Sequence, residues 1–115
     1  MFTSTIEWHL ITDNPLSLDW SSNDMVELEV AGKKITLARW QDGYYAFTQK
    51  CPHASGRMSA GFINPQGQVV CPLHRYAFDM KNGRNTSGEG YFLRTYPIEQ
   101  RPEGIFIGFK KNSLF

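Results

Sequence analysis

Two short segments of the chain, CPHASG at 51–56 and CPLHRY at 71–76, each begin with Cys-Pro and place a histidine close behind the cysteine. They contain both cysteines of the chain and two of its three histidines: Cys51, His53, Cys71 and His74. Thiolate and imidazole groups are common ligands of zinc and of iron-sulfur centres. Two matched segments of this kind predict a chain that folds around a metal centre.

Length and charge restrict what else the protein does. The 115 residues predict one domain, 1–115, which buries roughly two thirds of its unfolded surface. A formal charge of +1 gives no reason to expect nucleic acid or an anionic membrane as a partner. No segment approaches the ~20 apolar residues of a membrane span, and the first residues lack the basic start of a secretion signal. We therefore expect a cytoplasmic protein, in which cysteines serve as ligands or redox groups more often than as disulfides.

Much of the chain alternates apolar and polar residues with the period of a β-strand. MVELEVAGKKITLARW at 25–40 is typical of a hairpin with one buried face and a turn at Gly32. The aromatic segment YYAFT at 44–48 predicts a further strand, which ends shortly before Cys51. IFIGF at 105–109, after a turn at RPEG, predicts the closing strand.

The paired segments fall on loops between predicted strands. NPQG at 64–67 predicts a turn, and QVV at 68–70 predicts a short strand that leads into the second segment. YAFDMKNGRN at 76–85 predicts a strand, an Asn-Gly turn and a return strand. Apart from one helical turn expected within 15–24, no segment has helical periodicity. We predict an all-β fold, an antiparallel sandwich or small barrel, with a loop-rich unit at 51–86.

The order of the candidate ligands favours one kind of centre. Each loop supplies one thiolate and one imidazole, whereas a classical zinc finger takes its cysteines from one pair and its histidines from a helix. In Cys51-x-His53 the two ligands are one residue apart, a spacing that works when they bind neighbouring metals. This favours a [2Fe-2S] cluster with two cysteines on one iron and two histidines on the other. A structural zinc site and a Cys51–Cys71 disulfide are the alternatives, and the disulfide leaves both histidines unexplained.

The pattern Cys-x-His, a spacer of this size and Cys-x-x-His resembles the Rieske ferredoxins, and the resemblance covers nearly the whole chain. It implies the Rieske-type β fold and one [2Fe-2S] cluster. It also implies that Cys51 and Cys71 hold the inner iron, while His53 and His74 hold the outer iron near the surface. Two thiolates, two neutral imidazoles, two sulfides and two ferric ions sum to a neutral oxidised centre, whereas four thiolates would leave it at minus two. Reduction of the neutral centre is therefore easier. Potentials of about −150 to +300 mV, against about −400 mV for plant-type clusters, reflect this difference.

The resemblance implies an electron carrier and not an enzyme. Such a protein accepts electrons from a flavin-dependent or ferredoxin reductase and passes them to an oxygenase, for example an aromatic-ring hydroxylating dioxygenase. One alternative is an accessory small subunit of an assimilatory nitrite reductase-like complex. Another is a zinc-stabilised interaction domain, which would be colourless and redox-silent. The mononuclear iron domain of an oxygenase catalytic chain is not expected in 115 residues.

Several positions depart from the family pattern. High-potential members have two further cysteines at the positions of Gly56 and Leu73, which form a disulfide between the loops. They also donate hydroxyl hydrogen bonds to cluster sulfurs from the positions of Tyr76 and Phe78. Phe78 has no donor and Tyr76 is a poor substitute for serine, so we expect a potential at the low end of the Rieske range. The covering loop, TSGEGY at 86–91, contains glycines where the family usually has proline.

Four further residues border the candidate ligands: Arg57, Met58, Leu73 and Arg75. An apolar centre with basic flanks predicts a docking rim for a transient redox partner. The alternative is a set of solvated loop residues with Met58 packed inward. His9, in EWHLI, lies on a predicted strand far from the loops, and we expect an ordinary structural or surface histidine there.

Overall fold

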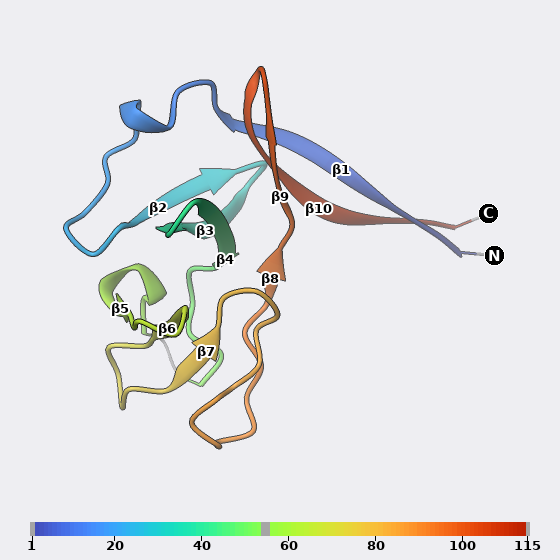
Figure 1. Cartoon of the computed structure of the whole chain (residues 1–115). Helices are drawn as coiled ribbons and strands as arrows, with labels where there is room; N and C mark the ends of the chain where they lie inside the picture. The colour runs from blue at the N-terminus through green and yellow to red at the C-terminus, as the bar shows by residue number, and fades with distance from the viewer. Residues whose placement is uncertain (1, 54–55, 115) are drawn as a thin grey trace.

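The computed structural model describes residues 2–53 and 56–114, which form three antiparallel sheets (Figure 1). The first sheet has the order β1-β10-β9, with β1 (Phe2–Thr12), β9 (Ile98–Arg101) and β10 (Gly104–Leu114). The second has the order β2-β3-β4-β8, with β2 (Met25–Val30), β3 (Lys33–Trp40), β4 (Gly43–Thr48) and β8 (Thr95–Tyr96). The third has the order β5-β6-β7, with β5 (Phe62–Ile63), β6 (Gln68–Val70) and β7 (Ala77–Asp79). The all-β antiparallel prediction is confirmed.

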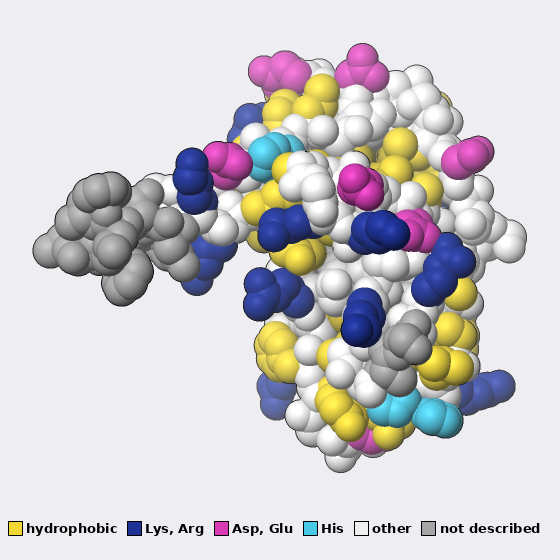
Figure 2. All heavy atoms as spheres, turned by 180° about the vertical axis from the view of Figure 1, so that it is seen from behind, with side chains coloured by type: hydrophobic (Ala, Val, Ile, Leu, Met, Phe, Trp, Pro, Cys, Tyr) yellow, Lys and Arg dark blue, Asp and Glu magenta, His cyan; other side chains and the backbone are white. Residues whose placement is uncertain are grey.

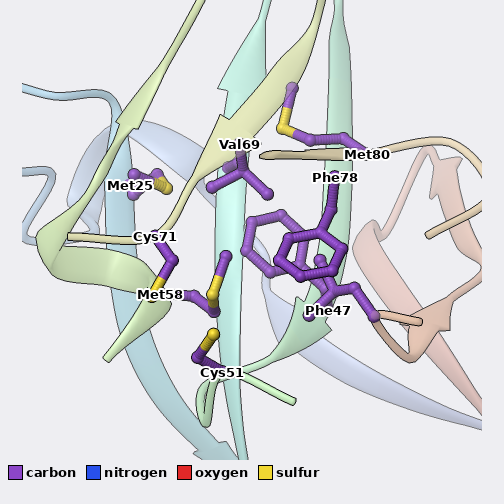
Figure 3. Packing of buried hydrophobic residues seen from close by; sticks show 10 residues of the cluster. Met25, Phe47, Cys51, Met58, Val69, Cys71, Phe78 and Met80 are labelled. Atoms are coloured by element: carbon purple, nitrogen blue, oxygen red, sulfur yellow. The ribbon is translucent and has the colours of Figure 1, made fainter. Parts of the chain in front are cut away.

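Two clusters of buried side chains hold these sheets together. The basal cluster lies between the first and second sheets and consists of Val26, Ile35, Leu37, Ala46, Ile107 and Phe109. The thiol cluster joins the second sheet to the third and contains Met25, Ala38, Phe47, Cys51, Met58, Val69, Cys71, Phe78, Met80 and Leu93 (Figure 3). Both candidate cysteines therefore belong to a packed core and are not on the surface.

Strand β3 serves both clusters. The predicted hairpin at 25–40 is present, since β2 is paired with β3 along its whole length. The expectation of a single buried face was wrong. Ile35 and Leu37 pack in the basal cluster, whereas Ala38 packs in the thiol cluster. The loop-rich unit covers the face that an isolated hairpin would leave to water (Figure 1).

Helical structure is limited to two short 3-10 turns, η1 (Pro15–Ser17) and η2 (Met58–Ala60). The first lies in the segment where a helical turn was predicted. The side-chain oxygen of Asn14 accepts a hydrogen bond from the Leu16 N–H at 3.1 Å and caps it. Among the described residues, no helix is long and apolar enough to cross a membrane.

The segment after β7 corrects one prediction. An Asn-Gly turn follows the strand, but the predicted return strand is reduced to the isolated bridge Phe78↔Asn85. The Asn85 side chain explains the difference, because its Nδ2 donates to the Ala77 carbonyl oxygen and to Glu89 Oε1, both at 3.0 Å. These hydrogen bonds fold the chain after Asn85 into a loop.

β1 and β10 form a long ribbon whose far end carries both termini (Figure 1). Their pairing runs from Phe2↔Leu114 to Thr12↔Ile105. The closing strand, predicted at 105–109, is therefore longer than its apolar pattern indicates. The extension has a pairing partner in β1, which is almost the whole chain away in sequence.

Candidate metal centre

The two motif loops leave different strands but close in the same way. β4 leads into Cys51, whose N–H donates to the carbonyl oxygen of Gly56 at 2.8 Å. β6 leads into Cys71, whose N–H donates to the carbonyl oxygen of Tyr76, also at 2.8 Å. Each cysteine is thus held at the base of a tight loop by a bond to a carbonyl five positions further along the chain.

The two thiols form the buried side of the site. Cys51 and Cys71 are free cysteines with exposed fractions of 1% and 0%. Burial, and after it the side-chain hydrogen bond with Cys51, raise the pKa of the Cys71 thiol from 9.0 to about 11. Without a metal, Cys71 therefore keeps its proton at neutral pH. Metal binding must displace that proton, as thiolate ligation requires.

The two imidazoles form the outer side of the site. Nδ1 of His74 lies 3.1 Å from Nε2 of His53, and the ring centroids are 4.9 Å apart. Figure 2 shows paired histidine side chains at one end of the molecule. Nδ1 of His53 is buried, and the described residues offer it no hydrogen-bond partner. An unpartnered buried imidazole nitrogen is an unusual feature that metal ligation would account for.

The four candidate ligands thus form two pairs, one of thiols and one of imidazoles. Within residues 2–53 and 56–114, no three His, Cys, Asp or Glu side chains converge on a single ion site. The separation of the thiol pair from the imidazole pair is the arrangement expected for a centre with two metals.

His9 lies on β1, where its Nε2 is 3.1 Å from Glu7 Oε1 and its ring centroid is 5.3 Å from that of Phe109.

The loops contact each other where the resemblance places a disulfide. A Cβ atom added to Gly56 would lie 3.2 Å from Leu73 Cγ, so the Leu73 side chain packs directly over Gly56. The second loop also contains two non-glycine residues in the left-handed region, His74 with φ 62° and Arg75 with φ 59°. An apolar contact therefore joins the loops here, and the backbone is strained at the last candidate ligand and at the residue after it.

The predicted docking rim is wrong in one member. Met58 is fully buried in the thiol cluster, as the alternative interpretation of the rim expected. Arg57 is exposed, with Nη2 2.5 Å from Glu27 Oε1 of β2. Two members of the predicted rim remain exposed next to His74 and can contact a partner: Leu73, with 41% of its surface exposed, and Arg75.

Sequence reasoning missed two tyrosine rings around His53. The His53 ring centroid lies 4.0 Å from that of Tyr76 and 5.6 Å from that of Tyr91. Tyr91 comes from the covering loop, which turns through Gly88 and Gly90 at φ 92° and 85°. Desolvation, followed by the charge of Glu89, raises the pKa of Tyr76, so its phenol stays neutral at physiological pH. The glycines of this loop were the only sequence signal of such a turn.

The thiol pKa predicts that the metal-free protein loses stability in alkali. An unfolded chain ionises Cys71 near pH 9.0, whereas the folded chain keeps the proton up to about pH 11. The unfolded state therefore binds fewer protons between these values, and stability falls as the pH rises through them. We expect the melting temperature of the metal-free protein, followed by circular dichroism, to fall across this interval and the Cys71→Ser variant to show a flatter profile. Parallel profiles for the two proteins would contradict a raised pKa of the Cys71 thiol as the cause of the loss of stability.

Two relatives resemble the chain over most of its length. It is 31% identical to the ferredoxin component of the naphthalene 1,2-dioxygenase system of Pseudomonas aeruginosa. The alignment spans 85 residues, which are 73% of this chain and 81% of that protein. It is 33% identical over 82 residues to the ferredoxin component of the naphthalene 1,2-dioxygenase/salicylate 5-hydroxylase systems of a Ralstonia species, covering 70% of this chain and 78% of the relative.

The fold and the family agree with these relatives. A solved structure from Mycobacterium tuberculosis, named for the small subunit of an NADH-dependent nitrite reductase, superimposes with a TM-score of 0.77. It covers 91% of this chain and 96% of its own, and its 21% identity shows a shared fold. The model of the Rieske [2Fe-2S] domain matches residues 12–97, which include both motif loops. With its paired thiols and paired imidazoles inside that match, the chain belongs to the Rieske [2Fe-2S] domain family.

Proposed function

We propose that the thiol pair and the imidazole pair together hold the [2Fe-2S] cluster of this family. The ligands are Cys51 and Cys71 on the buried side and His53 and His74 on the outer side. The unpartnered Nδ1 of His53 is the observation that carries the assignment. The family match favours this cluster over the zinc alternative. When bound, the cluster supplies one-electron redox chemistry.

The surroundings of the four ligands suit exchange of electrons with another protein. Met58, Phe78 and Leu93 are fully buried around the cysteines and exclude water from that side. His74 is exposed, so the imidazole end is open to a partner. We therefore infer a cytoplasmic carrier that accepts single electrons from a flavin-dependent reductase and passes them to an oxygenase. An aromatic-ring hydroxylating dioxygenase is the acceptor class to which its relatives point.

A transfer assay tests this function. The iron-loaded protein is mixed anaerobically with NADH and a trace of the flavin reductase of an aromatic dioxygenase system, and its visible absorption is followed. We expect bleaching over many turnovers of the reductase, and recovery when an oxidised oxygenase component is added. A protein that holds its cluster but exchanges electrons with neither component would contradict the carrier function.

The residues next to the candidate ligands predict that this protein has a low reduction potential compared with other members of the family. Phe78 is fully buried in the thiol cluster and has no hydroxyl, and the ring of Tyr76 lies against His53. Because Phe78 cannot donate a hydroxyl hydrogen bond to a cluster sulfur, the more negative reduced state is less stabilised. We expect a midpoint in the lower part of the range of about −150 to +300 mV, measured by voltammetry. A value near the top of that range would overturn this reasoning.

A fixed accessory subunit of a nitrite reductase-like complex is the second candidate. The M. tuberculosis structure favours it because the shared fold covers nearly all of both chains. Purification from the source cells separates the two functions. A fixed subunit would elute with a large flavin or sirohaem subunit, whereas a carrier would elute alone as a small protein.

A further inference from the structure

The 3-10 turn η2 follows the first motif loop, and the first residue of this turn is buried. Met58, its first residue, has no exposed surface and packs in the same cluster as Cys51 and Cys71 (Figure 3). The Met58 N–H donates to the carbonyl oxygen of Gln49 at 2.8 Å, so η2 folds back onto the chain just before Cys51. The position of η2 therefore helps to decide how the two thiols are packed.

The side chain of Gln49 joins η2 to the second sheet. Only 6% of this residue is exposed. Its Nε2 donates to Ser59 Oγ at 2.7 Å, and its Oε1 accepts from the Ser59 N–H at 3.2 Å. Oε1 also accepts from the hydroxyl of Thr36, a fully buried residue of β3. One buried amide thus connects the strand at the centre of the molecule with the turn that carries Met58.

The side chain of Asn23 holds η2 from its other end. Its Nδ2 donates to the carbonyl oxygens of Ser59 at 2.8 Å and Gly61 at 2.9 Å, and its Oδ1 accepts from the Met25 N–H at 3.3 Å. Gly61 itself lies tightly against β6, because a Cβ atom there would be 1.9 Å from the Val70 carbonyl oxygen. Val70 directly precedes Cys71, so the far end of η2 contacts the strand that delivers the second thiol.

We propose that Gln49 and Asn23 are positioning residues that hold η2 and Met58 against both thiols and thereby preorganise the cysteine side of the cluster site. Together with Ser59 they form what we call the η2 clasp. This inference rests on the proposed ligand assignment. None of the three is proposed as a ligand: Asn23 and Gln49 hydrogen-bond to the backbone of η2 and of Gly61, and the Ser59 hydroxyl accepts from Gln49. The physical basis is that buried polar groups without partners are costly, so a broken clasp lets η2 move or lets water enter.

The test compares cluster loss in iron-loaded variants. Gln49→Ala and Ser59→Ala are exposed to an iron chelator, the decay of visible absorption is timed, and the EPR spectrum of the dithionite-reduced protein is recorded. We expect loss about 10–100-fold faster than in the wild type, as for other changes that disturb the support of metal ligands, together with a broadened or shifted signal. Ser59→Thr keeps the hydroxyl that accepts from Gln49 and is expected to lose its cluster at close to the wild-type rate. In the double variant with Gln49→Ala and Ser59→Ala, the free-energy effect on cluster loss should be smaller than the sum of the two single effects. Both changes break the same connection between Gln49 and Ser59.

Thr12→Ala is the matched control. Thr12 is also a buried hydrogen-bonding residue, bonded to the Asn14 carbonyl oxygen at 3.0 Å, but it lies on β1, outside the thiol cluster. We expect a lower melting temperature and an unchanged rate of cluster loss. If Gln49→Ala does not fold, Ser59→Ala carries the test alone. Wild-type rates and spectra in the clasp variants, or equal acceleration in Thr12→Ala, would overturn the clasp; a wild-type protein without a cluster would instead overturn the proposed function.

Discussion

Replacement of His74 by alanine is expected to leave the protein unable to retain its cluster. His74 supplies half of the imidazole pair, and its Nδ1 lies 3.1 Å from the His53 ring. Under the proposed assignment, the outer iron would then keep a single protein ligand, while the buried thiols would still hold the other iron. Iron and sulfide contents of purified His74→Ala, and its visible spectrum, should therefore fall close to those of a metal-free protein.

His9→Ala provides the control for this experiment. His9 is the third histidine of the chain, lies on β1 and contacts Glu7 and Phe109. Its loss should lower stability slightly and leave the iron and sulfide contents at wild-type values. Equal cluster contents in His74→Ala and His9→Ala would show that the outer ligands have been assigned wrongly.

Gly83→Ala is expected to unfold the loop-rich unit or to weaken it severely. Gly83 has φ +80°, and a Cβ atom there would lie 1.9 Å from the carbonyl oxygen of Leu93, a fully buried member of the thiol cluster. Left-handed strain costs about 1–2 kcal/mol, and forcing a neighbour aside in a packed region costs about 1–3 kcal/mol more. We expect a loss of about 2–5 kcal/mol in the free energy of unfolding, measured with urea. Cluster content should fall with it.

Gly88→Ala separates strain from contact. Gly88 has a similar φ of +92°, but a Cβ atom there has nothing within 4 Å. Only the strain of about 1–2 kcal/mol applies, and an exposed loop relieves part of it. A loss in Gly88→Ala as large as that in Gly83→Ala would mean that the approach to Leu93 does not limit this turn.

Strand types and turns were predictable because they depend on local chemistry. The hairpin at 25–40, the strand before Cys51 and the turn at 64–67 all follow from alternation and turn residues close together in sequence. The two-sided burial of β3 and the length of β10 were not predictable in this way. Both depend on segments far away in the chain, the loop-rich unit in one case and β1 in the other.

The candidate site shows the same division. The order and spacing of ligand types predict Cys51, His53, Cys71 and His74 as candidate ligands without any structure. The rings of Tyr76 and Tyr91 beside His53, and the η2 clasp, are visible only when three loops and a strand are placed in space. A buried glutamine has no pattern that distinguishes it from a surface one, since its role depends on which partners the fold brings to it.

The most direct measurement is the EPR spectrum of the protein expressed with iron and reduced with dithionite, recorded beside analyses of iron, sulfide and zinc. We expect a Rieske-type signal with two irons and two sulfides per chain. A colourless, zinc-loaded protein without an EPR signal would contradict the assignment of a [2Fe-2S] cluster and, with it, the proposed transfer of electrons.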